Sequence, residues 1–273
     1  MSLNLVRIRE LAGWGFDNYE YRPDALTRAK SARATSILAK SSPYKSVDVV
    51  LGPETETLSE MFAPHAQRAD LLMEMSGLSW SFGVVDLRSL IAFQRRLSFN
   101  AKIAQPVVPA VCEWTSLFAL SFGPANPVEH EATHNRSTNT LILQSNNPNL
   151  HLRVTNNPAC PVSVHAGSPF FEVANFRDRW FLRDGYHRAH ALLKANVFAV
   201  PAVIVKAETI EELGADRPWF YPEDVLLSNN PPLVVDFLNE DFVVEYHRPP
   251  LIKTVRIKME ETLTPATHIG EQS

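Results

Sequence analysis

The segment from Phe170 to Lys206 constrains the fold of this 273-residue chain more than any other, because its hydrophobic period changes along it. An apolar run from Phe170 to Phe176 is followed by the charged triplet 177–179 and by a second apolar run, Trp180 to Leu182. Two aromatic-rich runs joined by a few charged residues are typical of a β-hairpin. The segment therefore opens with two predicted antiparallel strands.

The second half of this segment predicts a helix and a further strand. Asp184-Gly185 ends the hairpin, and apolar residues then recur at i, i+3 and i+4 from Ala189 to Leu193, which is helical spacing. The run from Val200 to Val205 is rich in β-branched residues and long enough for a buried strand. The predicted unit is strand, turn, strand, glycine turn, helix, strand.

The glycine turn is the candidate site of chemistry. A helix that begins just after Gly185 directs its unpaired N–H groups and the positive end of its dipole at whatever precedes it. Glycine permits close approach to the backbone, and His187 and Arg188 add donors and charge at the same place. These features indicate a phosphate or carboxylate site. The alternative is an ordinary glycine turn whose histidine and arginine only cap and solvate a surface helix.

The order of these elements resembles the core of the ParB N-terminal / sulfiredoxin superfamily. The family carries a strand pair, a Gly-x-(His/Arg)-Arg-x-x-Ala turn and helix, and then a strand that contains proline. The matching residues here are Gly185, His187, Arg188 and Ala191, followed by the strand 200–203. Within the same resemblance, 84–91 and Gln94 correspond to the family's opening strand and its continuation.

The resemblance implies a nucleotide held by its phosphates at Gly185-Tyr186-His187-Arg188. The nucleotide is ATP or ADP in the kinase-like and sulfiredoxin branches and CTP in the ParB branch. Tyr186 stands where the sulfiredoxin branch has its catalytic cysteine, so that reductase chemistry is not expected. The chain also lacks the acidic residue that follows the glycine in the ParB branch. Asp184, Gly185 and Arg188 match the Asp-Gly-His-x-Arg string of the amino-acid kinases, with the histidine displaced by one position.

Two carboxylates are the candidates for catalysis at this turn. Phosphate chemistry needs neutralisation of charge and an acceptor for a proton, and Asp184 or Glu172 would hold a magnesium ion or act as that base. The leading hypothesis is therefore a nucleotide-binding protein that uses ATP, ADP or CTP with magnesium. Phosphoryl transfer and nucleotide hydrolysis are its candidate reactions.

Arg188 is the residue on which this hypothesis depends most. A basic side chain in the first turn opposes the helix dipole, and the sequence indicates no packing role for it. A guanidinium can meet two phosphate oxygens in parallel, which lysine cannot reproduce. Replacement of Arg188 by alanine or lysine is expected to weaken nucleotide binding while the protein melts within a few degrees of the parent. Tyr186→Phe is expected to do much less.

A competing motif is the string His130-Glu131-Ala132-Thr133-His134, which fits the His-Glu-x-x-His pattern of zinc hydrolases. That pattern requires a helix that places both imidazoles on one face. Here the string lies between Pro124-Ala125-Asn126-Pro127 and Asn135-Arg136-Ser137-Thr138-Asn139, without apolar periodicity around it. The context favours a polar surface loop, and no zinc is expected. A zinc hydrolase remains the third and weakest hypothesis.

The second hypothesis is a non-enzymatic, ParB-like regulatory or DNA-associated module. The stretch from Pro23 has helical spacing, and basic residues cluster on it, namely Arg22, Arg28, Lys30, Arg33 and Lys40. A net charge of −4 gives no general attraction for nucleic acid, and no helix-turn-helix pattern follows the core. A protein partner or a homodimer is left open.

The aromatic cluster 218–222, Pro-Trp-Phe-Tyr-Pro, has two interpretations. It is either a packing plug at a domain edge, which is the favoured interpretation, or a surface for stacking a base or contacting a partner.

Composition and segmentation predict an α+β fold with a ParB/sulfiredoxin-like mixed sheet. The expected parts are a mainly helical region at 1–80, a core at 81–206 with a β-hairpin insertion at about 102–168, and a C-terminal extension at 207–273 packed on the core. Two isolated cysteines, the absence of a signal peptide pattern and the absence of a long apolar run predict a cytoplasmic protein without a membrane segment.

Overall fold

A computed structural model gives the arrangement of the chain in two compact units. The structure describes residues 5–15, 23–39, 43–46, 49–100, 106–109, 113–124, 128–154 and 162–264. Unit 1 comprises 1–125 and 168–250, and unit 2 comprises 126–167 and 251–273. The cysteines at 112 and 160 and the basic residues at 22 and 40 lie outside the described residues.

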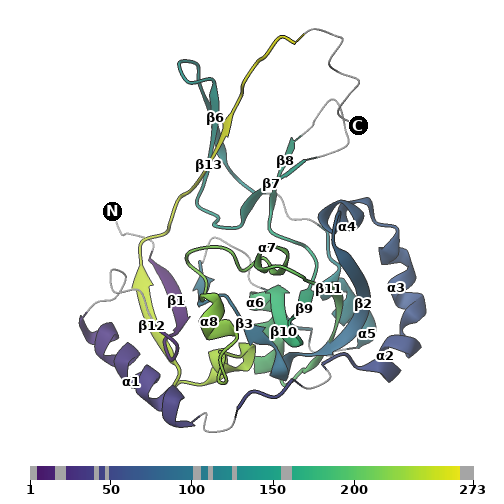
Figure 1. Ribbon diagram of the computed structural model, residues 1–273, viewed down its shortest axis with the longest axis vertical. Helices are drawn as coiled ribbons and strands as arrows, with labels where there is room; N and C mark the ends of the chain where they lie inside the picture. The colour runs from purple at the N-terminus through teal and green to yellow at the C-terminus, as the bar shows by residue number, and fades with distance from the viewer. Residues whose placement is uncertain are drawn as a thin grey trace. The chain divides into compact units, whose positions relative to one another are not determined.

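Unit 1 contains both helices and strands, and the described elements of unit 2 are strands (Figure 1). The elements of unit 1 are β1 (Val6–Leu11), α1 (Pro23–Ala39), α2 (Gly52–Thr57), α3 (Ser59–Ala66), α4 (Ala69–Glu74), β2 (Ser79–Asp86), η2 (Leu87–Ser89), β3 (Ile91–Ala92), β4 (Arg96–Phe99), α5 (Trp114–Ser121), β9 (Glu172–Phe176), β10 (Arg179–Asp184), α6 (Tyr186–Lys194), β11 (Ala199–Lys206), α7 (Ile210–Leu213), α8 (Glu223–Leu226), η3 (Val234–Leu238) and β12 (Val243–Arg248). The elements of unit 2 are β5 (Glu131–Asn135), β6 (Thr140–Ser145), β7 (Leu150–Val154), β8 (Val162–Ala166) and β13 (Lys253–Lys258). The chain is therefore α+β, as the sequence predicts.

The central sheet of unit 1 has the strand order β2-β11-β9-β10-β3. The predicted hairpin is confirmed: β9 and β10 pair antiparallel, and the turn between them is made by Arg177 and Asp178 at φ +50° and +58°. β11 runs parallel to β9, and β3 runs parallel to β10. The ends of β10 and β3 and the start of β9 consequently lie at one edge of the sheet, where the glycine turn follows β10.

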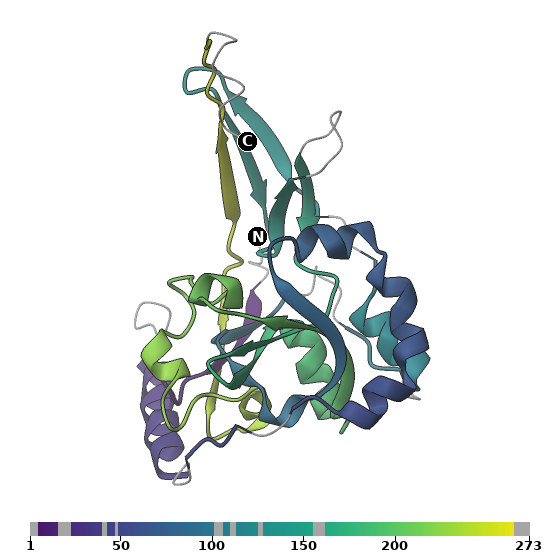
Figure 2. The same cartoon turned by 45° about the vertical axis from the view of Figure 1, so that its right-hand side comes forward.

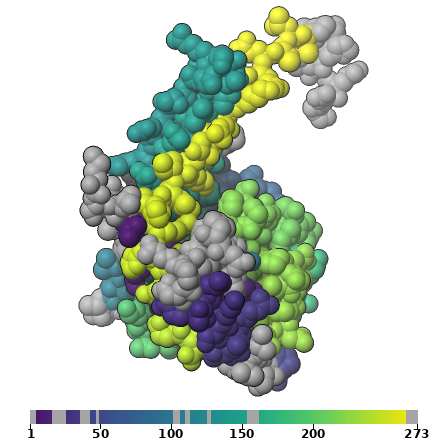
Figure 3. Space-filling model, turned by 90° about the vertical axis from the view of Figure 1, so that its left-hand side faces the viewer, coloured from purple at the N-terminus to yellow at the C-terminus, as the bar shows by residue number. Residues whose placement is uncertain are grey.

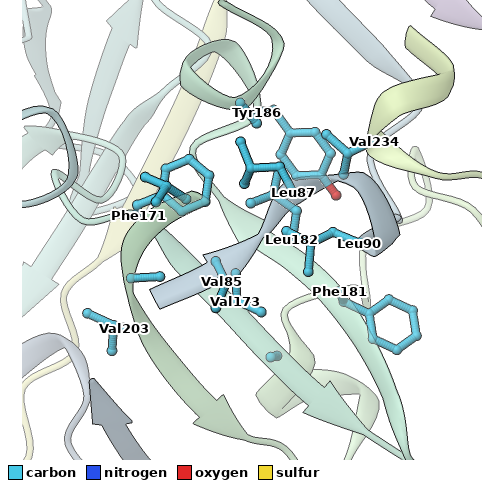
Figure 4. Packing of buried hydrophobic residues seen from close by; sticks show 14 of the residues in the cluster. Val85, Leu87, Leu90, Phe171, Val173, Phe181, Leu182, Tyr186, Val203 and Val234 are labelled. Atoms are coloured by element: carbon cyan, nitrogen blue, oxygen red, sulfur yellow. The ribbon is translucent and has the colours of Figure 1, made fainter. Parts of the chain in front are cut away.

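Helix α6 is confirmed where the spacing predicts it, and it packs its apolar face into the main core. Ala189 and Leu192 are fully buried, and Asn196 adopts φ +59° just after the helix, which is the left-handed conformation of a helix stop. Figure 4 shows side chains of this core, among them Tyr186, Leu87 and Val234. The helices α2, α3 and α4 lie beside β2, the edge strand of the sheet (Figure 2).

A second sheet of unit 1, in the order β12-β1-β4, carries helix α1. The helix predicted from Pro23 is confirmed, and its small residues Ala29 and Ala32 are buried in a cluster with Ile8 and Tyr246. Figure 3 shows α1 at the surface of unit 1. The strand Val6–Leu11 was not predicted, and it lies inside the region expected to be mainly helical.

Unit 2 contains a three-stranded sheet, β13-β6-β5, and a two-stranded sheet, β7-β8. The region predicted as an insertion at about 102–168 contains the strands β5 to β8, and β13 joins 251–264 to this unit rather than to the core. The polar loop predicted for the His-Glu-x-x-His string is wrong, because residues 131–135 form the exposed edge strand β5 paired with β6. In an extended strand the two histidines do not form the i, i+4 pair of a helix.

Among the described residues, no helix is both long and apolar enough to cross a membrane.

Candidate functional site

Gly185 is the structural reason that β10 can turn into α6. It adopts φ +100°, a conformation that L side chains rarely take, and it precedes the first residue of the helix. A Cβ atom at this position would lie 2.8 Å from Cδ2 of Phe171, a fully buried ring. Glycine also offers no side chain to cap the helix, so the first-turn N–H groups have no side-chain cap there. The turn therefore combines a close backbone approach with the positive end of a helix dipole.

Two carboxylates and two guanidinium groups surround this turn. Asp184 and Glu172 are partners across the β9–β10 pair, at a register shift. Glu172 is 2% exposed and accepts a short hydrogen bond from Arg183. Asp184 accepts a longer hydrogen bond, at 3.4 Å, from Arg188. The formal charges of the four groups cancel, so the cluster can exist at the end of a buried sheet. The structure thus brings together both predicted catalytic residues.

Asp184 has the perturbed carboxyl group of the cluster. Its side chain keeps 40% of its surface exposed, yet the carboxyl lies among protein atoms, and this desolvation raises its pKa to about 6. Arg188 opposes the rise, and the neighbouring Glu172 carboxylate adds to it. A carboxyl group with a pKa near 6 can accept or release a proton close to neutral pH.

Arg188 has a structural role that its sequence position does not reveal. Its guanidinium is 14% exposed and donates to the carbonyl oxygens of Leu120 at 3.1 Å, Pro169 at 2.6 Å and Phe170 at 2.6 Å. Its other partners are the carbonyl oxygen of Ser168 at 3.5 Å and the carboxylate of Asp184. Arg188 therefore ties the end of α5 and the start of β9 to the glycine turn. The interpretation that it lacks a packing role is wrong.

Arg183 was not singled out from the sequence. It donates to Glu172 and, through Nε, to the carbonyl oxygen of Glu212 at 3.2 Å. The only sequence signal was its position, since an arginine next to the last residue of an apolar strand must reach a partner if its strand is buried.

Tyr186 belongs to the core rather than to the exposed side of the turn. The residue is 5% exposed, and its hydroxyl oxygen accepts hydrogen bonds from the backbone N–H groups of Phe93 at 3.0 Å and Gln94 at 3.2 Å. Its ring lies edge-on to that of Phe93. Tyr186 is one of the four residues predicted to hold a phosphate, but its side chain is directed into the core, away from such a ligand.

His187 and His190 stand together on α6, with Phe99 edge-on to the first and tilted to the second. Burial is the main reason that the pKa of each histidine is lowered to about 4. Protonation of His190 would lower the pKa of His187 further, and the positive charges of Arg9, Lys194 and Arg7 lower that of His190. Nδ1 of His187 is buried and has no hydrogen-bond partner among the described residues. Both rings are consequently neutral at physiological pH.

This arrangement predicts that the protein loses stability between pH 6.5 and 4. A histidine with a folded pKa of about 4 and an ordinary value of 6.5 binds more protons when unfolded, so the free energy of unfolding falls as the pH is lowered through that window. We expect a loss on the order of 1 kcal/mol for each histidine between pH 7 and 5. Asp184 acts in the opposite direction, because its folded pKa of about 6 lies above its ordinary value of 3.8. Urea unfolding at both pH values measures the net effect.

The matched variant combines His187→Asn with His190→Asn. The pH dependence of its free energy of unfolding should be weaker than that of the parent or reversed, since Asp184 then dominates. Equal pH dependence in the parent and the double variant would contradict the assignment to these two histidines.

One oxygen of the cluster is without a hydrogen-bond partner in the described part of the chain. This atom is Oε1 of Glu172, which is buried. Buried polar atoms almost always have a partner, so such an atom indicates a water molecule, an ion or a ligand group beside it. Within the described ranges, no group of three or more His, Cys, Asp or Glu residues could hold a metal ion. Oxygen atoms of a phosphate would have to complete the coordination of any cation here.

A hollow of about 260 Å³ is apolar and lies in a different part of unit 1 from the charged cluster. It is lined by Thr55, Ser59, Phe62, Ala63, Ala66 and Phe82, which come from α2, α3 and β2. None of these residues carries a titratable group, and none belongs to the glycine turn. The charged cluster, rather than this hollow, is the candidate functional site.

No protein-family model, curated protein or solved structure matches the chain.

Proposed function

We propose that the chain is a nucleotide-binding protein of the ParB/sulfiredoxin-like type, with the phosphates held at the Gly185–Arg188 turn. The observation that carries the proposal is the meeting of a helix N-terminus, a glycine at φ +100° and a cluster of two carboxylates and two guanidinium groups at one sheet edge. Helix N-termini and guanidinium groups bind phosphate, and carboxylates can hold the magnesium ion that neutralises its charge.

The order of elements supports the type. A hairpin, a glycine turn, a helix and a strand parallel to the first hairpin strand follow one another, and β2 and β3 flank them in the sheet. The segment through Gln94 contacts the turn, because its backbone N–H bonds to Tyr186. The resemblance implies the same order of strand pair, glycine turn, helix and strand in a ParB/sulfiredoxin-like core.

The phosphate contacts are divided between backbone and side chains. The N–H groups of the first turn of α6 meet the phosphate oxygens, since Tyr186 points its side chain into the core. Arg188 already donates to four carbonyl groups, so its main role is to position the turn, and its charge acts on the ligand from there. His187 is neutral and can donate or accept a hydrogen bond, but it adds no charge.

The two carboxylates fit a magnesium ion that arrives with the nucleotide. Asp184 and the unpaired oxygen of Glu172 are oxygen ligands of the kind that magnesium takes, alongside phosphate oxygens and water. When bound, the ion would neutralise phosphate charge. Asp184, with a pKa of about 6, is the residue placed to accept a proton from an attacking hydroxyl group or water at its carboxylate oxygen. Phosphoryl transfer and nucleotide hydrolysis are the reactions that such a base serves.

A thermal-shift series with ATP, ADP, CTP and GTP, each with magnesium, tests the proposal. A ligand present at one hundred times its Kd stabilises the native state by about 2.7 kcal/mol, so at least one nucleotide should raise the melting temperature. Asp184→Asn should weaken that nucleotide about tenfold or more, because it removes the charged ligand of the cation. No shift with any nucleotide at millimolar concentration contradicts the proposal.

Asp216→Asn is the matched control for this series. It changes an aspartate of similar exposure, whose nearest cation is Arg217 at 3.7 Å, outside the cluster. It should leave nucleotide binding unchanged. A loss equal to that of Asp184→Asn would mean that the charge of the protein, and not the turn, determines the affinity.

A further inference from the structure

We propose that Trp219 provides the face on which the base of the nucleotide stacks. This inference rests on the proposed function and adds the second half of the binding site. The side chain of Trp219 is 56% exposed, whereas its neighbour Tyr221 is 1% exposed. A large exposed ring on a well-packed support is the form that base-stacking platforms take.

The support of this ring is rigid. The hydroxyl of Tyr221 donates a short hydrogen bond to the carbonyl oxygen of Leu11 within the core. The ring of Phe220 packs edge-on against that of Phe93, with centroids 4.9 Å apart, and Trp219 lies edge-on to Phe220 at 6.1 Å. The two residues that follow Trp219 are therefore held in place by these contacts. Little conformational freedom would be lost when a base stacks on the indole.

The segment lies at the same sheet edge as the glycine turn. Because β3 runs parallel to β10, Gln94 and Asp184 both leave the sheet at that edge. Gln94 forms a β-bridge with Phe220, and its N–H donates to the hydroxyl of Tyr186, the first residue of α6. In open sheets, ligands bind in the crevice outside the carboxyl ends of the strands. The position of Trp219 agrees with this rule.

The same segment also approaches the charged cluster from its other end. The carbonyl oxygen of Glu212 accepts from Nε of Arg183, and a Cβ at Gly214 would lie 3.8 Å from that nitrogen. Arg183 is the partner of Glu172 and the neighbour of Asp184 in sequence. The chain from 212 to 220 thus begins beside the charged cluster and ends beside the segment that follows β3, with Trp219 between these two contacts.

Aromatic contacts connect Trp219 to the start of α6. Three ring contacts, with centroids 6.1, 4.9 and 5.8 Å apart, lead from Trp219 through Phe220 and Phe93 to Tyr186 at the start of the helix. A base that stacks on Trp219 is recognised by its π-face, which every base has. This contact alone therefore predicts affinity for nucleoside triphosphates with little discrimination between purines and pyrimidines.

The experiment compares a ligand with a base and one without. Calorimetry measures the binding of ATP, CTP and inorganic tripolyphosphate, each with magnesium, to the parent, Trp219→Ala and Trp219→Phe. We expect Trp219→Ala to bind ATP and CTP about five- to 150-fold more weakly and to bind tripolyphosphate as the parent does. Trp219→Phe should keep most of the affinity and lose the nucleotide-dependent quenching of tryptophan fluorescence. Leu72→Ala, which truncates a residue that is 47% exposed on α4, is the control and should change none of these values.

Each outcome separates the two proposals. If ATP or CTP binds the parent and Trp219→Ala equally well, the stacking inference is wrong and the phosphate turn stands. An equal loss for tripolyphosphate and ATP in Trp219→Ala also overturns stacking, because the base is then irrelevant. If neither ATP, CTP nor tripolyphosphate binds the parent, the proposed function is wrong and the stacking inference fails with it.

Discussion

Arg188→Ala is expected to lower the free energy of unfolding by about 3–5 kcal/mol, the usual cost of removing one partner from a buried charged network. The variant leaves the carbonyl groups of Leu120, Pro169 and Phe170 without their donor and leaves Asp184 without its cation. The melting temperature should fall by roughly 6–20 °C, which differs from the few degrees expected from the sequence. Thermal and urea unfolding, followed by circular dichroism, measure both quantities.

Two further variants make this result specific. Arg188→Lys keeps the charge but cannot reach three carbonyl groups from one ammonium, so it should recover only part of the loss. Arg217→Ala removes a guanidinium whose side chain is 60% exposed and should cost at most about 0.5 kcal/mol. An Arg188→Ala protein as stable as the Arg217→Ala protein would show that the carbonyl contacts contribute nothing to stability.

Gly185→Ala is expected to destabilise the protein by about 2–5 kcal/mol, because it adds strain and a collision at one atom. The added methyl group would require a non-glycine residue at φ +100° and would lie 2.8 Å from the ring of Phe171. That ring is fully buried and cannot move without disturbing the core. The same variant should lose nucleotide binding more than its stability loss explains, since the backbone of the turn is the proposed phosphate ligand. Urea unfolding and nucleotide titration give the two numbers.

Gly214→Ala separates strain from collision. Gly214 has a similar φ of +81°, but the nearest atom to an added Cβ is Nε of Arg183, at 3.8 Å. It should therefore cost only about 1–2 kcal/mol from backbone strain. Equal destabilisation by the two variants would remove the close approach of Phe171 from the explanation.

The segment 170–206 could be predicted from sequence because its signals are local. The turn residues 177–178, the glycine after β10 and the helical spacing of 189–193 each determine the backbone within a few positions, and the structure confirms all four elements. Gly214 is a second local signal, since it follows α7 in the left-handed conformation that favours glycine.

The roles of Arg188 and Tyr186 could not be predicted because their partners are distant in sequence. The carbonyl of Leu120 is 68 positions from Arg188, and the N–H of Phe93 is 93 positions from the hydroxyl of Tyr186. Local pattern indicates which residue types stand at a turn but not which way each side chain points.

Strand β5 was missed because its pairing, and not its residues, makes it a strand. All five of its side chains are exposed, so there is no alternation of apolar and polar residues for sequence reasoning to detect. The backbone of β6 supplies the hydrogen bonds that hold it extended. The zinc-hydrolase pattern therefore occurs in a segment whose conformation is set by its neighbour.

During synthesis, the sheets that contain β12 and β13 can be completed only after most of the chain has been made. β12 closes the small sheet of unit 1 against β1, with contacts 236 positions apart, and β13 pairs with β6 across 110 positions. Loop closure over such distances costs entropy before any pairing is gained, and a two-stranded ribbon alone is marginal in water. Both sheets must therefore wait for the ribosome to release residues 243–258, while the signals of the central unit are already complete at residue 206. Until then, the edges of β1 and β6 lack these partners, and this is the interval in which the nascent chain is most exposed to wrong pairing.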